Sequence, residues 1–401
     1  MKVELHMLQN FPPSNLNRDD TGSPKDCEFG GVRRARISSQ CRKRSIRTSQ
    51  TFREDLGDRI AIRTKQSHTP LAERLVSAHG FDEAEAKGLA RGLVEVMLGW
   101  DEAKERTKVL FYVGHDELDR LAGLIVEHID TLRPAQQAVQ ALADDVKKKE
   151  RDAKEKALKD ALGEVKKAFT KEAQDHVRSV DIALFGRMLA EVPGMNIDAA
   201  CQVAHAISTN KVDMDFDYFT AVDDLNVKEE TGAGMIGTTG FNSACFYTYA
   251  LIDAEQLASN LGSDKALALD SIQAFLKAAL YAIPTGKQNS FAAQTPPSLF
   301  MTVVRERGAM PWSLANAFVE PVRGPRREDE PSLVGASIKK LDTHWASLAD
   351  MYGTEGTTCF VKVAQDAGTV DHLADAQAAN APEVIAKTAA ALQTWSGGGS
   401  A

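Results

Sequence analysis

Two strand patterns and one helix start are visible in the first fifty residues. Residues 3–8, VELHML, alternate in the manner of a half-buried strand. The Pro, Asn, Asp and Gly of residues 9–24 then predict a loop. Residues 32–37, VRRARI, alternate basic and apolar side chains and predict a second strand. Ser38 and Ser39 follow directly and favour the N-cap of a helix.

The second half of the chain interleaves strand and helix patterns. Residues 241–252, FNSACFYTYALI, carry the strongest strand pattern, through aromatic and β-branched residues. Asp253 and Gly262 favour the two ends of a short helix. The remaining predictions are a helix over 263–282, a loop over 286–297, a strand over 298–307 and a terminal helix over 333–353.

The middle of the chain predicts a helical insertion. Residues 68–180 are rich in Ala, Leu and charged residues and have few β-branched runs. Within them, residues 144–177 mix charges at i,i+4 spacing. Each such pair stabilises an exposed helix by about 0.2–0.5 kcal/mol. The strands are too few and too widely separated for a doubly wound sheet. The sequence therefore predicts an α+β sandwich with insertions.

Charge is distributed very unevenly along the chain. The overall net charge is −8, which argues against a general nucleic-acid binder. Residues 25–53, however, contain nine Lys or Arg and two acidic residues, a local charge of +7. The remainder of the chain then carries −15, and this asymmetry points to one cationic surface on an acidic protein.

Composition excludes several classes of protein. The five cysteines include no CxxC pair and lie near no histidine cluster, so we expect reduced thiols, no metal site and no cofactor. The N-terminus lacks the apolar run of a signal peptide, and no uncharged stretch approaches membrane-spanning length. We therefore expect a cytoplasmic protein without membrane contact.

The basic segment has the chemistry of a phosphate cradle. Backbone N–H groups at the start of the helix after Ser38 point outward and favour phosphate. Lys43 and Arg47 share a helix face, and hydroxyl and amide groups of Ser38 and Gln40 suit ribose or phosphate oxygens. The upstream strand adds further bases: Arg33, Arg34 and Arg36. The alternative is a basic strip that only solubilises a helix.

A second constellation is a polar and aromatic stretch interrupted by glycines, which predicts an exposed hairpin. Tyr218, Phe219 and Ile236 offer faces on which bases can stack, each contact worth roughly 1–3 kcal/mol. These residues, and Met188 with them, are alternatively ordinary core residues. Lys287 and Gln288 lie in a predicted loop and are further candidates for RNA contact.

An enzymatic interpretation rests on Asp19 and Asp20. Paired carboxylates in a loop are suited to holding a metal ion or to acid–base work, although NRDDTGSP is also good turn chemistry. The GTTG at 237–240 lacks the Lys and Ser/Thr of a phosphate-binding P-loop. A metal-dependent ribonuclease using these aspartates, and a helical scaffold without RNA contact, remain the alternatives.

Several motifs together resemble one family along nearly the whole chain. They are SNLNRDDTGSPK, FGGVRRARISSQCRKRSIR, VDIALFGRM, AHAIST, DYFTAVDDLN, GTTGFNSACFYTYA and SLANAF. In this order they resemble the crRNA-binding backbone subunit of type I-E CRISPR Cascade. Divergence is concentrated at about residues 55–175, so contacts made there are not carried over.

The resemblance implies a hand-like protein with an RRM-like (ferredoxin-like) palm. The implied parts are palm segments at 1–60, 179–212 and 241–395, helical fingers at 61–178, a β-hairpin thumb at 213–240 and a flexible tail at 396–401. Copies of such a subunit coat the guide RNA, and each thumb displaces a base. The implied partners are crRNA, target DNA in an R-loop, further copies of the chain, and the large, small and guide-end-capping Cascade subunits.

The resemblance and the residue chemistry together define a predicted RNA-binding set. Phosphate and sugar contacts implied by the family fall on Arg18, Lys25, Ser38, Gln40, Lys43 and Arg47, and base contacts on Met188, Phe219 and Ile236, with Tyr218 beside them. The remaining members are Arg33, Arg34, Arg36, Ser39, Arg44, Lys287 and Gln288. The family implies no catalysis by this subunit.

Overall fold

A computed structural model describes residues 1–143, 146–172, 177–221 and 235–397. The chain forms two compact units. The sheet unit contains residues 1–55, 201–255 and 268–401, and the helical unit contains residues 56–200 and 256–267. The insertion therefore extends beyond the predicted 61–178. Residues 179–200, predicted as palm, belong to the helical unit because they pack with the insertion.

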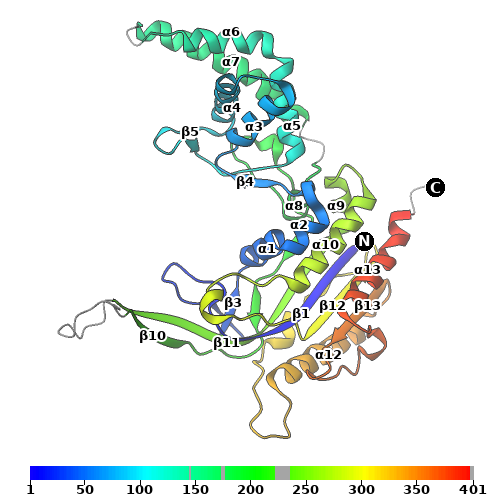
Figure 1. Cartoon of the computed structure of the whole chain (residues 1–401). Helices are drawn as coiled ribbons and strands as arrows, with labels where there is room; N and C mark the ends of the chain where they lie inside the picture. The colour runs from blue at the N-terminus through cyan, green and yellow to red at the C-terminus, as the bar shows by residue number, and fades with distance from the viewer. Residues whose placement is uncertain (144–145, 173–176, 222–234, 398–401) are drawn as a thin grey trace, which may run out of the picture. The chain divides into compact units, whose positions relative to one another are not determined.

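The sheet unit is built on one nine-stranded antiparallel sheet (Figure 1). Its main path has the order β13-β12-β1-β11-β9-β3-β2, and β8 and β10 also pair with β11. The strands are β1 (Lys2–Ser14), β2 (Asp26–Phe29), β3 (Val32–Ile37), β8 (Cys201–Val203), β9 (Ala206–Ser208), β10 (Asp215–Ala221), β11 (Met235–Asp253), β12 (Leu299–Arg305) and β13 (Thr357–Val363). The strands predicted at 32–37, 241–252 and 298–307 are confirmed, the first with its exact ends.

The first strand is longer than its sequence pattern predicts. β1 pairs with β11 from Lys2↔Asp253 onward and continues through two prolines to Ser14. The loop predicted from residue 9 is therefore wrong over residues 9–14. The register shifts between Phe11 and Ser14, and a bulge is one of the few places where a strand tolerates proline.

Helices cover both faces of this sheet (Figure 1). On one face, alternate residues of β12 and β13 pack against α12 and the short 3₁₀ helix η4 (Leu314–Phe318). On the other face, Thr302 of β12 bonds Thr388 of α13 through their hydroxyl groups, 2.6 Å apart. The helices of this unit are α1 (Ser39–Thr48), α2 (Gln50–Leu56), α9 (Ala254–Asn260), α10 (Lys265–Tyr281), α11 (Gln288–Phe291), α12 (Leu333–Tyr352) and α13 (Ala381–Gly397), of which α2, α9 and α10 cross into the helical unit.

The C-terminal part of the chain contains more structure than predicted. α12 is not the terminal helix, because β13 and α13 follow it and complete the sheet edge and its cover. The predicted loop at 286–297 contains the short helix α11. The tail was expected from residue 396, whereas α13 ends at Gly397 and residues 398–401 lie outside the described chain.

The helical unit has its own apolar core. In α7 the buried positions Leu162, Val165 and Phe169 recur at helical spacing, and the rest of this helix is largely exposed, which confirms the prediction of a mixed-charge surface helix. Its elements are α3 (His68–His79), α4 (Glu83–Leu98), α5 (His115–Glu127), α6 (Ile129–Gln140), α7 (Lys148–Glu172) and α8 (Val180–Phe185), with the short pairs β4 (Ile62–Thr64) with β7 (Phe111–Val113) and β5 (Trp100–Asp101) with β6 (Arg106–Thr107). Among the described residues, none of the helices is long and apolar enough to cross a bilayer.

One buried arginine joins several segments of the sheet unit. Arg34 on β3 is fully buried, and its guanidinium donates to five backbone carbonyls at 2.8–3.2 Å. The acceptors are the carbonyls of Phe29, Ser208, Thr209, Phe318 and Val319. A guanidinium has five N–H donors, so none is left for RNA. The prediction that Arg34 contacts RNA is therefore wrong, because its side chain points into the core.

We predict that Arg34→Met lowers the free energy of unfolding by about 3–5 kcal/mol, because buried carbonyls lose their donors. The neighbouring Arg33→Ala is the matched control. Arg33 is exposed and forms a surface ion pair with Asp26, so its loss should cost less than about 1 kcal/mol. Equilibrium urea unfolding measures both values. Equal stability of the two variants would contradict the role of Arg34.

Candidate nucleic-acid interface

Two buried or half-buried asparagines hold the loop at residues 15–25 in place. The side-chain amide of Asn15 donates to the carbonyl of Gly22 at 3.0 Å and to that of Gly240, on β11, at 2.9 Å. The Oδ1 of Asn17 accepts a hydrogen bond from the backbone N–H of Ser38 at 2.8 Å. The loop is thereby fastened both to the root of the β10–β11 hairpin and to the start of α1.

The predicted helix start is confirmed. Ser38 is the N-cap of α1, and its Oγ accepts from the backbone N–H of Cys41 at 3.3 Å. Ser38 is buried, so its main role in the free protein is capping. Ser39 is half-buried and donates to the side-chain carbonyl of the exposed Gln40 at 3.3 Å. The first turn of α1 thus presents polar side chains beside its backbone N–H groups.

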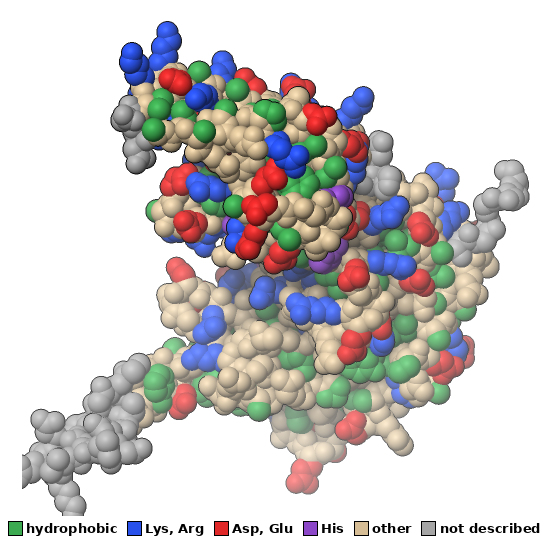
Figure 2. Space-filling view, turned by 45° about the horizontal axis from the view of Figure 1, so that its top comes forward, with side chains coloured by type: hydrophobic (Ala, Val, Ile, Leu, Met, Phe, Trp, Pro, Cys, Tyr) green, Lys and Arg blue, Asp and Glu red, His purple; other side chains and the backbone are tan. Residues whose placement is uncertain are grey.

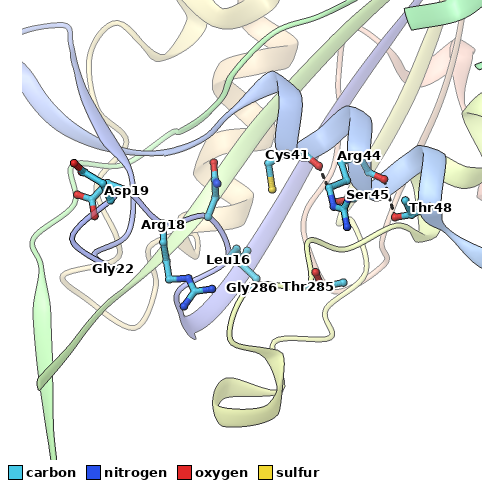
Figure 3. Close-up of a pocket in the computed structure, with 12 residues that line it drawn as sticks. Leu16, Arg18, Asp19, Gly22, Cys41, Arg44, Ser45, Thr48, Thr285 and Gly286 are labelled. Carbon is cyan, nitrogen blue, oxygen red and sulfur yellow. Dashed lines mark hydrogen bonds between the residues drawn. The ribbon is translucent and has the colours of Figure 1, made fainter. Parts of the chain in front are cut away.

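The loop and α1 enclose an open cavity of about 580 Å³ in the sheet unit. Figure 3 shows Arg18 extending from the loop and Arg44 from α1, with the turn at Thr285 and Gly286 beside them. Both arginines are exposed. The lining residues are Leu16, Asn17, Arg18, Asp19, Asp20, Gly22, Cys41, Arg44, Ser45, Thr48, Thr285 and Gly286. Asp19 and Asp20 balance the charge of Arg18 and Arg44 in this lining. Arginine and hydroxyl groups in an open cavity are suited to the ribose-phosphate of RNA.

Asp19 shapes the loop. Its Oδ1 accepts hydrogen bonds from the backbone N–H of Thr21 (2.9 Å), the Thr21 hydroxyl (2.8 Å) and the backbone N–H of Ser23 (3.0 Å). The Thr21 hydroxyl is the largest cause of the lowered pKa of Asp19. Asp20 is exposed. Within the described part of the chain, no three His, Cys, Asp or Glu side chains are grouped to hold a metal ion.

The bases on and beside β3 have different environments. Arg33 is exposed and forms a two-point ion pair with Asp26 at 2.7 and 3.2 Å. Arg36 donates to the Nδ1 of His205 at 2.9 Å and to the carbonyl of Asp26 at 3.1 Å. Desolvation, Arg36 and Lys25, in decreasing order, lower the pKa of His205. Lys25, Arg36 and His205 therefore form one group, which the sequence did not indicate because His205 is distant in the chain.

The face of α1 that lines the cavity differs from the predicted face, which carries Lys43 and Arg47. The lining positions are Cys41, Arg44, Ser45 and Thr48, at spacings of three and four residues. Lys43 and Arg47 are half-buried and do not line the cavity. Arg44 was among the predicted residues, whereas Ser45 and Thr48 were not. Thr48 lies four residues after Arg44 and three after Ser45, a spacing that would have placed them on one helix face.

The hairpin of β10 and β11 presents exposed aromatic side chains. Figure 2 shows hydrophobic side chains at the surface next to its grey part. Tyr218 is 67% exposed and Phe219 is 41% exposed. Phe219 lies opposite Gly237, where an added Cβ would stand 2.4 Å from the phenyl ring. Phe216, 66% exposed, was missed, although DFDYF shows it in alternation with Tyr218. Ile236 pairs with Thr220 through the backbone, and its side chain lies outside the described residues.

Two other predicted residues lie in the turn near the root of the hairpin. The ammonium of Lys287 donates to the Thr239 hydroxyl, on β11, at 3.2 Å. The side-chain amide of Gln288 instead donates to the carbonyls of Pro284 (3.0 Å) and Ala293 (3.4 Å). The N–H groups of Gln288 stabilise its own loop, and RNA contact by this residue stays a prediction.

One predicted residue, Met188, lies at the surface, whereas two arginines, Arg187 and Arg42, are buried. Met188, in the helical unit, is 90% exposed, so it is not core filler. The preceding Arg187 is buried and forms a two-point ion pair with Glu117 at 2.7 and 2.9 Å. Arg42 is buried in α1 and donates to the carbonyl of Ala282 at 3.3 Å. Burial lowers the pKa of Arg42 to about 10.

Comparisons with known proteins add a family and two structural neighbours. The family model described as "CT1975-like protein" matches residues 3–388. A chain of a "CRISPR RNA-guided surveillance complex, pre-nicking" superposes with a TM-score of 0.77 at 30% identity, covering 98% of this chain and 100% of that one. A chain of a "CRISPR RNA-guided surveillance complex" gives a TM-score of 0.69 at 27% identity, with coverage of 98% and 100%. No curated protein matches. The predicted resemblance to a surveillance-complex subunit is confirmed at this level.

Gly286 allows the turn at residues 285–286 to pack against the backbone of the loop that begins at Asn15. A Cβ added at Gly286 would lie 2.3 Å from the carbonyl oxygen of Leu16, so the turn and the loop could not keep their contact. We predict that Gly286→Ala lowers the free energy of unfolding by about 1–3 kcal/mol. Gly324→Ala, with no atom within 4 Å of the new Cβ, is the control and should change it by less than about 0.5 kcal/mol. Urea unfolding of both variants tests this, and equal effects would contradict it.

Proposed function

The chain belongs to the CT1975-like protein family, and we propose that it is the crRNA-binding backbone subunit of a CRISPR surveillance complex. The observation that carries this proposal is the cavity between the loop and α1. There Arg18 and Arg44 stand beside hydroxyl groups, in a protein whose charge outside residues 25–53 is −15. Such a surface holds ribose-phosphate without reading sequence and leaves base edges free to pair with a target.

The finer assignment follows the motifs. The order of NRDD, GGVRRARISSQ and FTAVDDL favours the type I-E class of Cascade. In this proposal the sheet unit acts as an RRM-like palm, the helical unit as fingers and the β10–β11 hairpin as the thumb. The partners are crRNA, target DNA, further copies of the chain and the other Cascade subunits, in the cytoplasm.

We further propose that this subunit is not catalytic. The Oδ1 of Asp19 already accepts three hydrogen bonds that shape its loop, which explains the aspartate without a metal ion. The ribonuclease alternative, with Asp19 and Asp20 as catalytic residues, has no specific observation in its favour.

We predict that Arg18→Ala and Arg44→Ala each weaken binding of single-stranded guide RNA about tenfold, the value of a charged hydrogen bond of about 1.4 kcal/mol. Each should also reduce the slope of log affinity against log salt by about 0.7, because one phosphate contact is lost. Fluorescence anisotropy across a NaCl series measures both quantities.

Lys340→Ala is the matched control, since Lys340 lies on α12 beside Glu320, away from the cavity. It should leave affinity and slope unchanged. Losses that depend on the guide sequence, or an equal loss in the Lys340 variant, would refute the proposed phosphate cradle.

A second prediction concerns the hairpin. The complex coexpressed with guide RNA and its sister subunits should protect RNA from nuclease as a ladder with one fixed period. Phe219→Ala should leave the RNA bound but make the protected fragment lengths irregular, because the aromatic ring that separates bases is lost. Tyr281→Ala removes another exposed aromatic of the sheet unit, outside the hairpin, and should leave the ladder intact. An unchanged ladder in the Phe219 variant would exclude this residue from base displacement.

A further inference from the structure

A second cavity lies within the helical unit, separate in residues from the RNA cradle. It has a volume of about 720 Å³, which is in the range of ligand sites. Helices α3 and α4 and the β5–β6 turn provide its walls. Nothing in the proposed RNA-binding role uses these residues.

The floor of this cavity is apolar. Ala72 is buried, and Val76, on the same face of α3 one turn later, is 38% exposed to the open space. The Trp100 indole lies beside them, with the His68 ring against it at 5.1 Å in an edge-on arrangement. An apolar side chain of a few carbons would be accommodated by this floor.

The same wall carries buried polar atoms without partners. Trp100 is 8% exposed, and its indole N–H has no hydrogen-bond acceptor among the described residues. The Nδ1 of His68 is likewise buried and unpaired within the described chain. Such groups are rare in native proteins and call for a partner. Because an indole N–H can only donate, the missing partner of Trp100 is an acceptor such as a carbonyl oxygen.

Three carboxylates and two cations line the cavity, an excess of one carboxylate. Glu83 is paired with Lys87 at 2.6 Å, and Arg91 is paired with Glu102 at 2.7 Å. Glu73 and Glu105 form no ion pair with any described residue. Glu105 is also held in a left-handed conformation, with φ of 46°, which a side chain rarely adopts without a reason. This rim repels phosphate and attracts a cation.

We propose that this cavity binds a peptide segment of a partner protein that presents an apolar side chain next to a lysine or arginine. The apolar side chain would lie over Ala72 and Val76, a backbone carbonyl would accept from Trp100, and the basic side chain would pair with Glu73 or Glu105. The unpaired carboxylates argue against RNA. The chain's own hairpin is a poor occupant because β10 carries the exposed Asp215 and Asp217, with the exposed Asp213 just before it.

The test uses the isolated full chain and a defined probe. The chain has four tryptophans, so its indole N–H groups give few NMR signals, and Trp100→Phe assigns the relevant one. The probe is the peptide acetyl-Gly-Lys-Leu-Lys-Gly-amide, compared with its Glu-Leu-Glu counterpart. We expect a saturable downfield shift of the Trp100 signal with the lysine peptide, and at least about tenfold weaker binding of the glutamate peptide.

Variants separate the parts of the proposal. Glu73→Gln with Glu105→Gln should weaken the lysine peptide about tenfold, and Val76→Arg should abolish its binding, while Asp152→Asn on the exposed face of α7 should change nothing. The other three tryptophans lie in the sheet unit, so far-UV circular dichroism and thermal unfolding that match the unsubstituted chain are used to confirm that each variant is folded. Absence of a saturable Trp100 shift, equal binding of both peptides, or unaltered binding by the Glu73 and Glu105 variant would overturn the proposal. None of these outcomes bears on RNA binding by the sheet unit.

Discussion

The arrangement of the sheet unit depends on one buried arginine, Arg34, which forms no ion pair with any described residue. Arg34 satisfies five backbone carbonyls, which lie at the end of β2, at and just after the end of β9, and at and just after the end of η4. Each buried carbonyl left without a donor would cost about 1–3 kcal/mol, so the guanidinium holds these segments in one position. β3 is fixed as a result, and α1 begins where β3 ends. The position at which α1 begins, and with it this wall of the cavity, follows from this contact.

The remaining contacts transmit that position to the loop and the hairpin. Asn17 joins the loop to Ser38, and Asn15 joins it to Gly240 on β11. Gly286 permits the third wall to approach the backbone of Leu16. The cradle is therefore assembled from chain segments more than two hundred residues apart, before any RNA is bound. Pre-organisation of this kind reduces the ordering cost of binding.

The two units divide the chemistry between them. Residues 25–53 of the sheet unit concentrate cations in a protein that is acidic elsewhere, which suits a polyanion. The helical unit combines an apolar floor with unpaired carboxylates, which suits a basic peptide. An RNA surface and a protein surface of opposite charge need not compete for the same ligand, because each repels the ligand of the other.

The sequence by itself determined the local elements and the existence of a cationic surface. The strand at 32–37, its serine-capped helix and the aromatic hairpin strands follow from alternation, capping and propensity, which are properties of neighbouring residues. Only the tertiary structure decided which basic residues reach the surface. Arg33 and Arg34 have the same side chain, yet Arg33 is exposed, whereas Arg34 is buried and donates to carbonyls of distant segments. The stripe of α1 that lines the cavity and the place of His205 beside Arg36 were decided in the same way, because burial and hydrogen bonding depend on neighbours that are remote in the chain.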